Sequence, residues 1–218
     1  WADDGVDKPS YVACVLYGMT QVLPQFPVFN AYLREWPFVK LALYENIDIA
    51  YTTEKPDEEG KPILTLSMLR ECGGLTFNEF LARFKKQKEA SLEELKYRQT
   101  HKRFGLIPNF LRTPLFRLFC KPFPSVMRQI AGTVGFTSVG KDGVDFTTPL
   151  SPKSLTVSLG AVKKRPMAID DEVIVRKSAY ITLTYDHRVA DGRDCARFGA
   201  KLRKFLEEDI ASLKPKEK

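Results

Sequence analysis

The sequence predicts a mixed α/β (α+β) fold, in which strands and helices follow one another without a regular repeat. Three observations lead to this prediction. Apolar residues recur at helical spacing near both ends of the 218-residue chain. Stretches of alternating apolar and polar residues, typical of strands, occupy much of the remainder. The segments that connect these strands differ greatly in length, which argues against a regular series of β-α-β units.

The first part of the chain predicts one helix followed by strands. Apolar residues at helical spacing begin after Pro9 and Ser10, and Pro24 ends the helix because proline lacks the amide proton that a helix needs. Residues 29–34 predict a short strand. Residues 38–53 predict a strand, a turn and a second strand, since their apolar positions alternate.

A turn, a strand and a second helix come next. The acidic stretch KPDEEGKP carries the glycine and prolines that are typical of turns, and residues 63–69 (ILTLSML) resume as a strand. Residues 75–97 predict an amphipathic helix. Thr76 and Glu79 have the spacing of a capping box, in which each residue satisfies a backbone amide of the other at the start of a helix.

Residues 100–131 form a basic, aromatic segment that is interrupted by four prolines. We expect short helical turns here rather than a strand. The favoured interpretation is a hydrophobic flap that packs on the domain or on a neighbouring subunit. The alternative is contact with a membrane surface, because aromatic side chains interleaved with Lys and Arg suit such an interface. His101 lies in a polar, basic stretch, and we expect it to be exposed and uninvolved in chemistry.

The last third of the chain is rich in predicted strands. These strands lie in GTVGFTSVG (132–140), SLTVSLGAV (154–162) and DEVIVRKSAYITLTYDH (171–187). After Asp191 the period changes to that of an amphipathic helix. The apolar stripe of this helix consists of Cys195, Phe198, Leu202, Phe205, Leu206 and Ile210.

Composition and charge narrow the classes of function. The net charge is +7, but the basic residues are mixed with 27 acidic ones along the whole chain, and no nucleic-acid-binding motif accompanies them. Such a mild positive field favours an anionic ligand, such as the phosphates of CoA, or an acidic partner domain. The four cysteines are scattered and predict free thiols in a reducing compartment, with no metal site. Dinucleotide, Walker and nucleophile-elbow motifs are absent from the sequence.

One histidine has the setting of a catalytic base. His187 follows directly on a predicted strand, whose hydrogen-bonded ladder would hold the side chain at a defined position. A neutral imidazole there could accept a proton from a thiol or hydroxyl. Asp191 could cap the next helix or pair with an arginine. Thr137 and Ser138, at the end of another predicted strand, could donate a hydrogen bond to a developing oxyanion.

Several segments, in order, resemble one known family. YDHRVADG closely resembles the DHRxxDG signature of 2-oxo acid dehydrogenase acyltransferases, the catalytic domains of dihydrolipoamide acyltransferases. GTVGFTSVG resembles the family's GTFTISxLG segment, and SLTVSLGAVKKRP its following strand. The stretches beginning SYVACVLYG and YENIDIAYT resemble its first helix and its first hairpin. The resemblance covers about residues 10–99 and 132–212.

This resemblance implies a fold, an assembly and roles for residues. It implies a mixed-sheet domain like that of chloramphenicol acetyltransferase, assembled as a homotrimer or a higher oligomer with active sites between subunits. His187 would be the general base that deprotonates the thiol of CoA or of dihydrolipoamide. Thr137 aligns with the oxyanion-stabilising hydroxyl, with Ser138 as the alternative. Asp191 matches the acidic position of the motif, which in the relatives is mainly a structural anchor.

The resemblance also implies partners and marks departures from the family. CoA would be a substrate, a lipoyl group would act only in trans, and the components of a dehydrogenase complex would be partners, in the cytoplasm or the mitochondrial matrix. We expect residues 1–218 to form a single catalytic domain without a lipoyl or subunit-binding domain. The insertion at 100–131 is longer than is usual in the family, and Arg193 stands where a small residue is usual.

Two other functions remain open at this point. The first is a non-catalytic trimeric scaffold of a dehydrogenase-like complex, with residues 100–131 as its docking element. The second is a module that binds membrane surfaces or nucleic acid through its basic charge.

Overall fold

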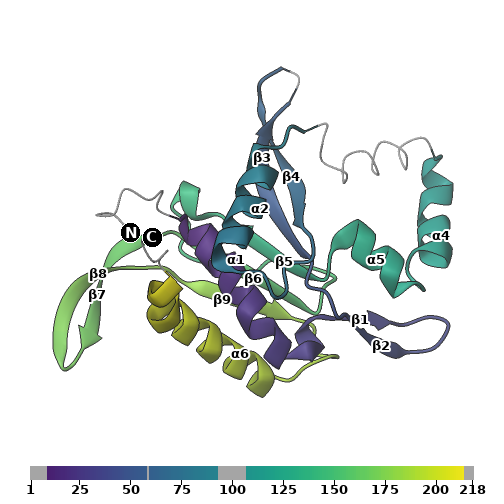
Figure 1. Ribbon diagram of the computed structural model, residues 1–218. Helices are drawn as coiled ribbons and strands as arrows, with labels where there is room; N and C mark the ends of the chain where they lie inside the picture. The colour runs from purple at the N-terminus through teal and green to yellow at the C-terminus, as the bar shows by residue number, and fades with distance from the viewer. Residues whose placement is uncertain (1–8, 58, 93–106, 214–218) are drawn as a thin grey trace.

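The computed structural model describes residues 9–57, 59–92 and 107–213, and its centre is a five-stranded mixed sheet (Figure 1). The strand order is β4-β3-β5-β6-β9. Strands β3, β5 and β6 are parallel, whereas β4 and β9 pair antiparallel at the two edges. The mixed α/β prediction is therefore confirmed. The bounds of these strands are Ile49–Pro56 (β3), Pro62–Leu69 (β4), Val134–Ser138 (β5), Leu155–Leu159 (β6) and Ile181–Tyr185 (β9).

Two separate hairpins extend from this sheet domain (Figure 1). The first pairs β1 (Ala31–Arg34) with β2 (Lys40–Leu43), at the positions expected from the sequence. The second pairs β7 (Lys163–Ile169) with β8 (Glu172–Ser178). The sequence did not predict β7. Its strand contains a proline, which lowers strand propensity, and it pairs only with β8, an edge setting in which proline is tolerated.

Three helices pack together on one face of the sheet (Figure 1). They are α1 (Tyr11–Val22), α2 (Phe77–Glu89) and α6 (Gly192–Lys204). Together with the inner strands they bury one core, whose largest side chains include Phe29, Phe80 and Phe198. Short 3-10 and π segments complete this part of the chain at Leu23–Gln25, Pro27–Phe29, Gly140–Asp142, Phe205–Asp209 and Ile210–Leu213.

The helix starts follow the predicted capping. Ser10 accepts a hydrogen bond from the Ala13 amide at 3.2 Å, and Thr76 and Glu79 form the expected capping box. Helix α2 is shorter than predicted, because it ends at Glu89. There the buried amine of Lys55 donates to the carbonyls of Lys88 and Ala90 and so terminates the helix from another element.

The insertion contains two helices in its described part, α4 (Asn109–Phe119) and α5 (Pro124–Ala131). Helical structure without strands is what the sequence predicted, although α4 makes three turns rather than one. His101 and the rest of the insertion before residue 107 lie outside the described residues. No helix among the residues that the structure describes is long and apolar enough to cross a membrane.

A buried carboxylate attaches α5 to the sheet. Asp48, just before β3, accepts hydrogen bonds from Arg70 and Arg128, both at 2.9 Å, and from the Glu71 amide at 2.8 Å. Burial acts to raise the pKa of Asp48, but these three donors outweigh it and hold the pKa below its usual value. Gly132, which follows α5, has a φ of 71° and would place a Cβ 2.9 Å from the Asp48 carbonyl oxygen, so this turn requires glycine.

Candidate active site

His187 lies two residues beyond the end of β9, in an exposed turn. Strand β9 pairs with β6 along its whole length, and this pairing fixes the position of the residue from which the turn begins. The imidazole lies against the Tyr185 ring, with the ring centroids 5.5 Å apart. Tyr185 in turn contacts Phe29 of the core at 6.3 Å. The predicted base therefore packs against an aromatic side chain that contacts the core, and it is exposed to solvent in the isolated chain.

Asp186 and Arg188, on either side of His187, form an ion pair that was not predicted from the sequence. The Arg188 guanidinium donates to both oxygens of the Asp186 carboxylate, at 2.9 and 2.6 Å, and lowers the pKa of that carboxyl. Arg188 also pairs with Glu35 on the β1–β2 hairpin. The histidine turn is thus tied to a hairpin about 150 residues away in the chain, a link for which the sequence offers no local pattern.

Asp191 caps helix α6. Its carboxylate accepts a hydrogen bond from the Asp194 amide at 2.9 Å, and its backbone is extended, as expected for the residue that precedes a helix. Of the two roles that the sequence left open, a helix cap or an arginine partner, the structure shows the cap. By starting α6, it sets the direction in which the chain leaves the histidine turn.

Thr137 and Ser138 lie at the end of β5, as predicted, but their hydroxyls differ in what they can donate. The Ser138 Oγ donates to the Leu159 carbonyl oxygen at 3.0 Å, and a carbonyl can only accept. The single proton of Ser138 is therefore occupied. The Thr137 Oγ1 lies 2.8 Å from the Thr52 Oγ1, and either hydroxyl can be the donor. When Thr52 donates, the Thr137 proton is available for another acceptor.

The strand register separates Thr137 from His187. Thr137 stands beside Ser158 of β6, and Ser158 stands beside Thr182 of β9. Strand β9 continues for three residues beyond Thr182, about 10 Å, before the turn that carries His187, and β5 and β9 are two strand spacings apart, or about 10 Å. A single chain therefore does not bring the two side chains together.

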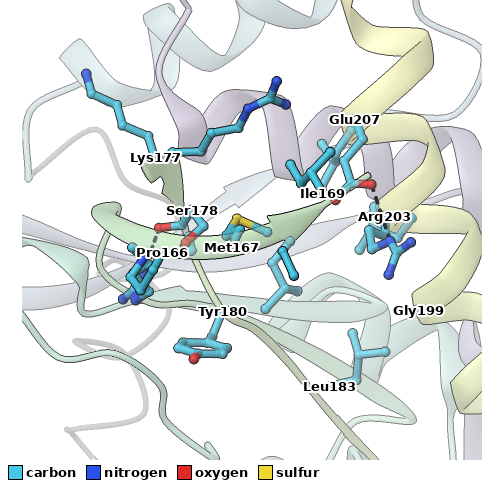
Figure 2. Close-up of a pocket in the computed structure, with 17 residues that line it drawn as sticks. Pro166, Met167, Ile169, Lys177, Ser178, Tyr180, Leu183, Gly199, Arg203 and Glu207 are labelled. Carbon is cyan, nitrogen blue, oxygen red and sulfur yellow. Dashed lines mark hydrogen bonds and ion pairs between the residues drawn. The ribbon is translucent and has the colours of Figure 1, made fainter. Parts of the chain in front are cut away.

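A cavity of about 1070 Å³ lies elsewhere, between the β7–β8 hairpin, β9 and α6 (Figure 2). Apolar side chains such as Met167 and Leu183 line it, with Arg203 and Glu207 paired at one side. The predicted site residues are not among those that line it. Among the described residues, no group of three or more His, Cys, Asp or Glu side chains is arranged to hold a metal ion.

The mixed sheet with its packed helices resembles the fold of several solved structures. The chain resembles the cubic core of a pyruvate dehydrogenase multienzyme complex with a TM-score of 0.65, at 20% identity, over 97% of this chain and 73% of the other. A probable dihydrolipoamide acetyltransferase from Listeria monocytogenes superposes with a TM-score of 0.64, at 18% identity, over 91% of this chain and 70% of the other. These similarities establish the fold.

Sequence comparison finds similarity in the C-terminal part of the chain. Residues 127–213 match the family described as 2-oxoacid dehydrogenases acyltransferase (catalytic domain). The relatives include a dihydrolipoyllysine-residue succinyltransferase component from Buchnera aphidicola, 37% identical over 81 residues, which are 36% of this chain and 20% of the relative. A dihydrolipoyllysine-residue acetyltransferase component from Mycobacterium bovis is 38% identical over 84 residues, which are 35% of this chain and 15% of the relative. The chain thus spans a fifth or less of the length of these curated relatives.

Proposed function

We propose that the protein is an acyltransferase that moves an acyl group between CoA and a thiol of the dihydrolipoamide type. The observation that carries this proposal is the placement of His187, at a rigid strand end within the segment that matches the acyltransferase family. The dihydrolipoamide acetyltransferase of Azotobacter vinelandii has the same fold, with a TM-score of 0.65. Its catalytic mechanism has been studied through a serine, a histidine and an asparagine four residues beyond the histidine. His187 and Asp191 have that spacing here.

In the proposed reaction His187 is the base. Its neutral imidazole takes the proton from the acceptor thiol, and the thiolate attacks the carbonyl carbon of the acyl thioester. A new carbon–sulfur bond forms, and the carbonyl oxygen becomes an oxyanion. When this tetrahedral intermediate collapses, the bond to the CoA sulfur breaks and the imidazolium returns the proton to CoA. No acyl group becomes attached to the protein.

The oxyanion requires a hydrogen-bond donor, and Thr137 is the proposed one. Its hydroxyl can accept a hydrogen bond from Thr52 and donate its own proton outward, whereas the Ser138 proton already goes to a backbone carbonyl. Because Thr137 and His187 are far apart within one chain, the proposed site lies between two copies, with one residue from each. A homotrimer, as the family resemblance implies, would form three such sites.

The wider setting follows from the same chemistry. CoA is a proposed substrate, and the lipoyl group would be carried by another chain. If that other chain were acidic, the basic surface of this protein would attract it. Other components of a 2-oxo acid dehydrogenase-like complex are the proposed partners. A cytoplasm or mitochondrial matrix that keeps thiols reduced is the proposed compartment, and the four cysteines are free.

The test is release of free CoA from acetyl-CoA by the purified chain with dihydrolipoamide as acceptor. His187→Ala should lower kcat by about 100- to 10,000-fold, because a positioned general base commonly contributes that much. His101→Ala, at the other histidine of the chain, is the matched control and should keep the wild-type rate. Full turnover by the His187→Ala variant would exclude the mechanism. A chain with no turnover and no thermal stabilisation by millimolar CoA would support the scaffold function instead.

A further inference from the structure

Exposed apolar side chains are concentrated on one part of the surface. Nineteen large apolar residues are exposed among those that the structure describes, and ten of them lie in residues 31–43 and 109–123. These are Trp36, Phe38, Val39, Leu41, Leu43, Phe110, Leu111, Leu118, Phe119 and Phe123. We call these two segments together the aromatic–basic surface. A large exposed apolar patch marks an interaction site in a soluble domain.

The two segments are neighbours and are bonded to each other. The Tyr32 hydroxyl of β1 donates to the Lys121 carbonyl oxygen at 3.0 Å, and the Tyr44 hydroxyl donates to the Pro124 carbonyl oxygen at 2.8 Å. Lys121 also pairs with Glu35 at 3.7 Å. The β1–β2 hairpin and the α4–α5 corner lie on the same side of the sheet domain (Figure 1). The two segments that carry these exposed apolar side chains are therefore neighbours in the fold.

Helix α4 presents an apolar stripe outward rather than into a core. Phe110 is 76% exposed and Leu118, two turns later on the same face, is 50% exposed, with the exposed Pro114 between them. At the tip of the β1–β2 hairpin, Phe38 is 75% exposed. The expectation that residues 100–131 form a flap packed on the domain or on a neighbouring subunit stays a prediction, and on the single chain this stripe of α4 is exposed. In this chain, the apolar face of α4 is left uncovered.

The charge of the surface indicates what covers it. The aromatic–basic surface contains five cationic residues and one acidic residue, Glu35, and no Asp or Glu occurs anywhere from residue 95 to residue 141. The cations are Arg34, Lys40, Arg112, Arg117 and Lys121. Two copies that met face to face through this same surface would bring like charges together, which disfavours that symmetric contact. An anionic, apolar partner matches both properties.

We propose that the aromatic–basic surface binds the surface of an anionic lipid bilayer. Phe, Trp and Leu side chains would enter the boundary between head groups and acyl chains, while Arg and Lys side chains would contact the lipid phosphates and carboxylates. The attachment would be peripheral and reversible, because an 11-residue helix and a hairpin tip bury only a modest apolar area. It would hold the proposed acyltransferase at a membrane surface.

The test is co-sedimentation of the full chain with vesicles of phosphatidylcholine that contain about 30% phosphatidylserine, an anionic content that attracts basic surfaces. We expect binding that weakens in high salt and is much weaker with pure phosphatidylcholine. Trp36→Ser combined with Phe38→Ser should weaken binding at least about tenfold, because buried aromatic side chains dominate such interfaces. Arg117→Glu should weaken it by roughly fivefold or more, since each cation near an anionic surface contributes measurably.

The matched control is Val173→Ser combined with Val175→Ser on the β7–β8 hairpin. These two valines are 75% and 67% exposed, similar to the hairpin-tip residues, but they lie outside the aromatic–basic surface. This control should bind vesicles like the wild type, and circular dichroism establishes that all variants are folded. Absence of vesicle binding, or equal loss in the control, overturns the proposal. A drop in oligomeric mass in the Trp36/Phe38 variant, without vesicle binding by the wild type, identifies the surface as a subunit contact and also overturns it.

Discussion

The hydroxyl oxygens of Thr52 and Thr137 lie 2.8 Å apart, on neighbouring parallel strands β3 and β5. This contact distinguishes Thr137 from the adjacent Ser138, whose proton is donated to the Leu159 carbonyl. A hydroxyl that accepts from a neighbour keeps its own proton available and gains a defined orientation. The structure therefore supports Thr137 over Ser138 as the proposed oxyanion donor.

The first prediction concerns the proposed oxyanion donor. Thr137→Val keeps the side-chain shape but removes the hydroxyl, and kcat should fall by about 100- to 1,000-fold, the usual effect of deleting an oxyanion donor. Ser138→Ala is the matched control, and its kcat should change less than about tenfold. Steady-state release of CoA by both variants measures the difference. If the Ser138 variant lost more activity than the Thr137 variant, the assignment would be reversed.

The second prediction concerns the site between subunits. Neither His187→Ala nor Thr137→Val homo-oligomers should be active, but a mixture that exchanges subunits should regain activity. With equal amounts in a cyclic oligomer, about one site in four pairs an intact histidine with an intact threonine from another copy. Activity is measured before and after exchange at constant total protein. A mixture that stays inactive, although mass measurement shows mixed oligomers, would contradict a shared site.

The third prediction concerns Asp191 as a helix cap. Asn caps helices about as well as Asp, whereas Ala does not, so Asp191→Ala should lower the free energy of unfolding by about 1 kcal/mol and Asp191→Asn should leave it nearly unchanged. The Asn variant should also keep its kcat within a few-fold of the wild-type value. Urea unfolding and the CoA-release assay supply the two readouts. A large loss of kcat in a fully stable Asn variant would indicate a role for the carboxylate charge in the reaction.

The fourth prediction concerns pH and the carboxylate that holds α5. Asp48→Asn removes the partner of Arg70 and Arg128, and the free energy of unfolding at pH 7 should fall by about 3 kcal/mol, as for a broken buried ion pair. The pKa of Asp48 is lowered in the folded chain, so its stabilising contribution is fully present above the unfolded value of 3.8 and is lost as pH falls below it. Denaturant unfolding at a series of pH values from 7 to 2.5 measures how the free energy of unfolding changes.

In that series, the wild type and the Asp48→Asn variant should converge in stability toward the acid end. Glu59→Gln is a suitable control, because its ion pair with Lys61 is exposed on both sides and contributes little. A difference between wild type and variant that stays constant down to pH 2.5 would show that the carboxylate charge is not what stabilises this junction.

Local sequence patterns determined much of the fold and one half of the candidate site. Ser10, Thr76 and Asp191 were identifiable as helix caps because a cap bonds amides only two or three residues away. The strands of the central sheet were identifiable from alternation along each segment. His187 was identifiable from its motif and from the strand before it. Each of these depends on interactions within a few residues of the chain.

The tertiary structure alone decided the features that depend on which strands become neighbours. The register β5-β6-β9 separates Thr137 from His187, and the β3–β5 pairing brings Thr52 to Thr137 across 85 residues of sequence. At the end of α2, Lys55 from β3 donates to the Ala90 carbonyl, a contact that no residue of the helix itself predicts. Strand neighbours are selected by packing of the whole core, and no local spacing encodes that choice.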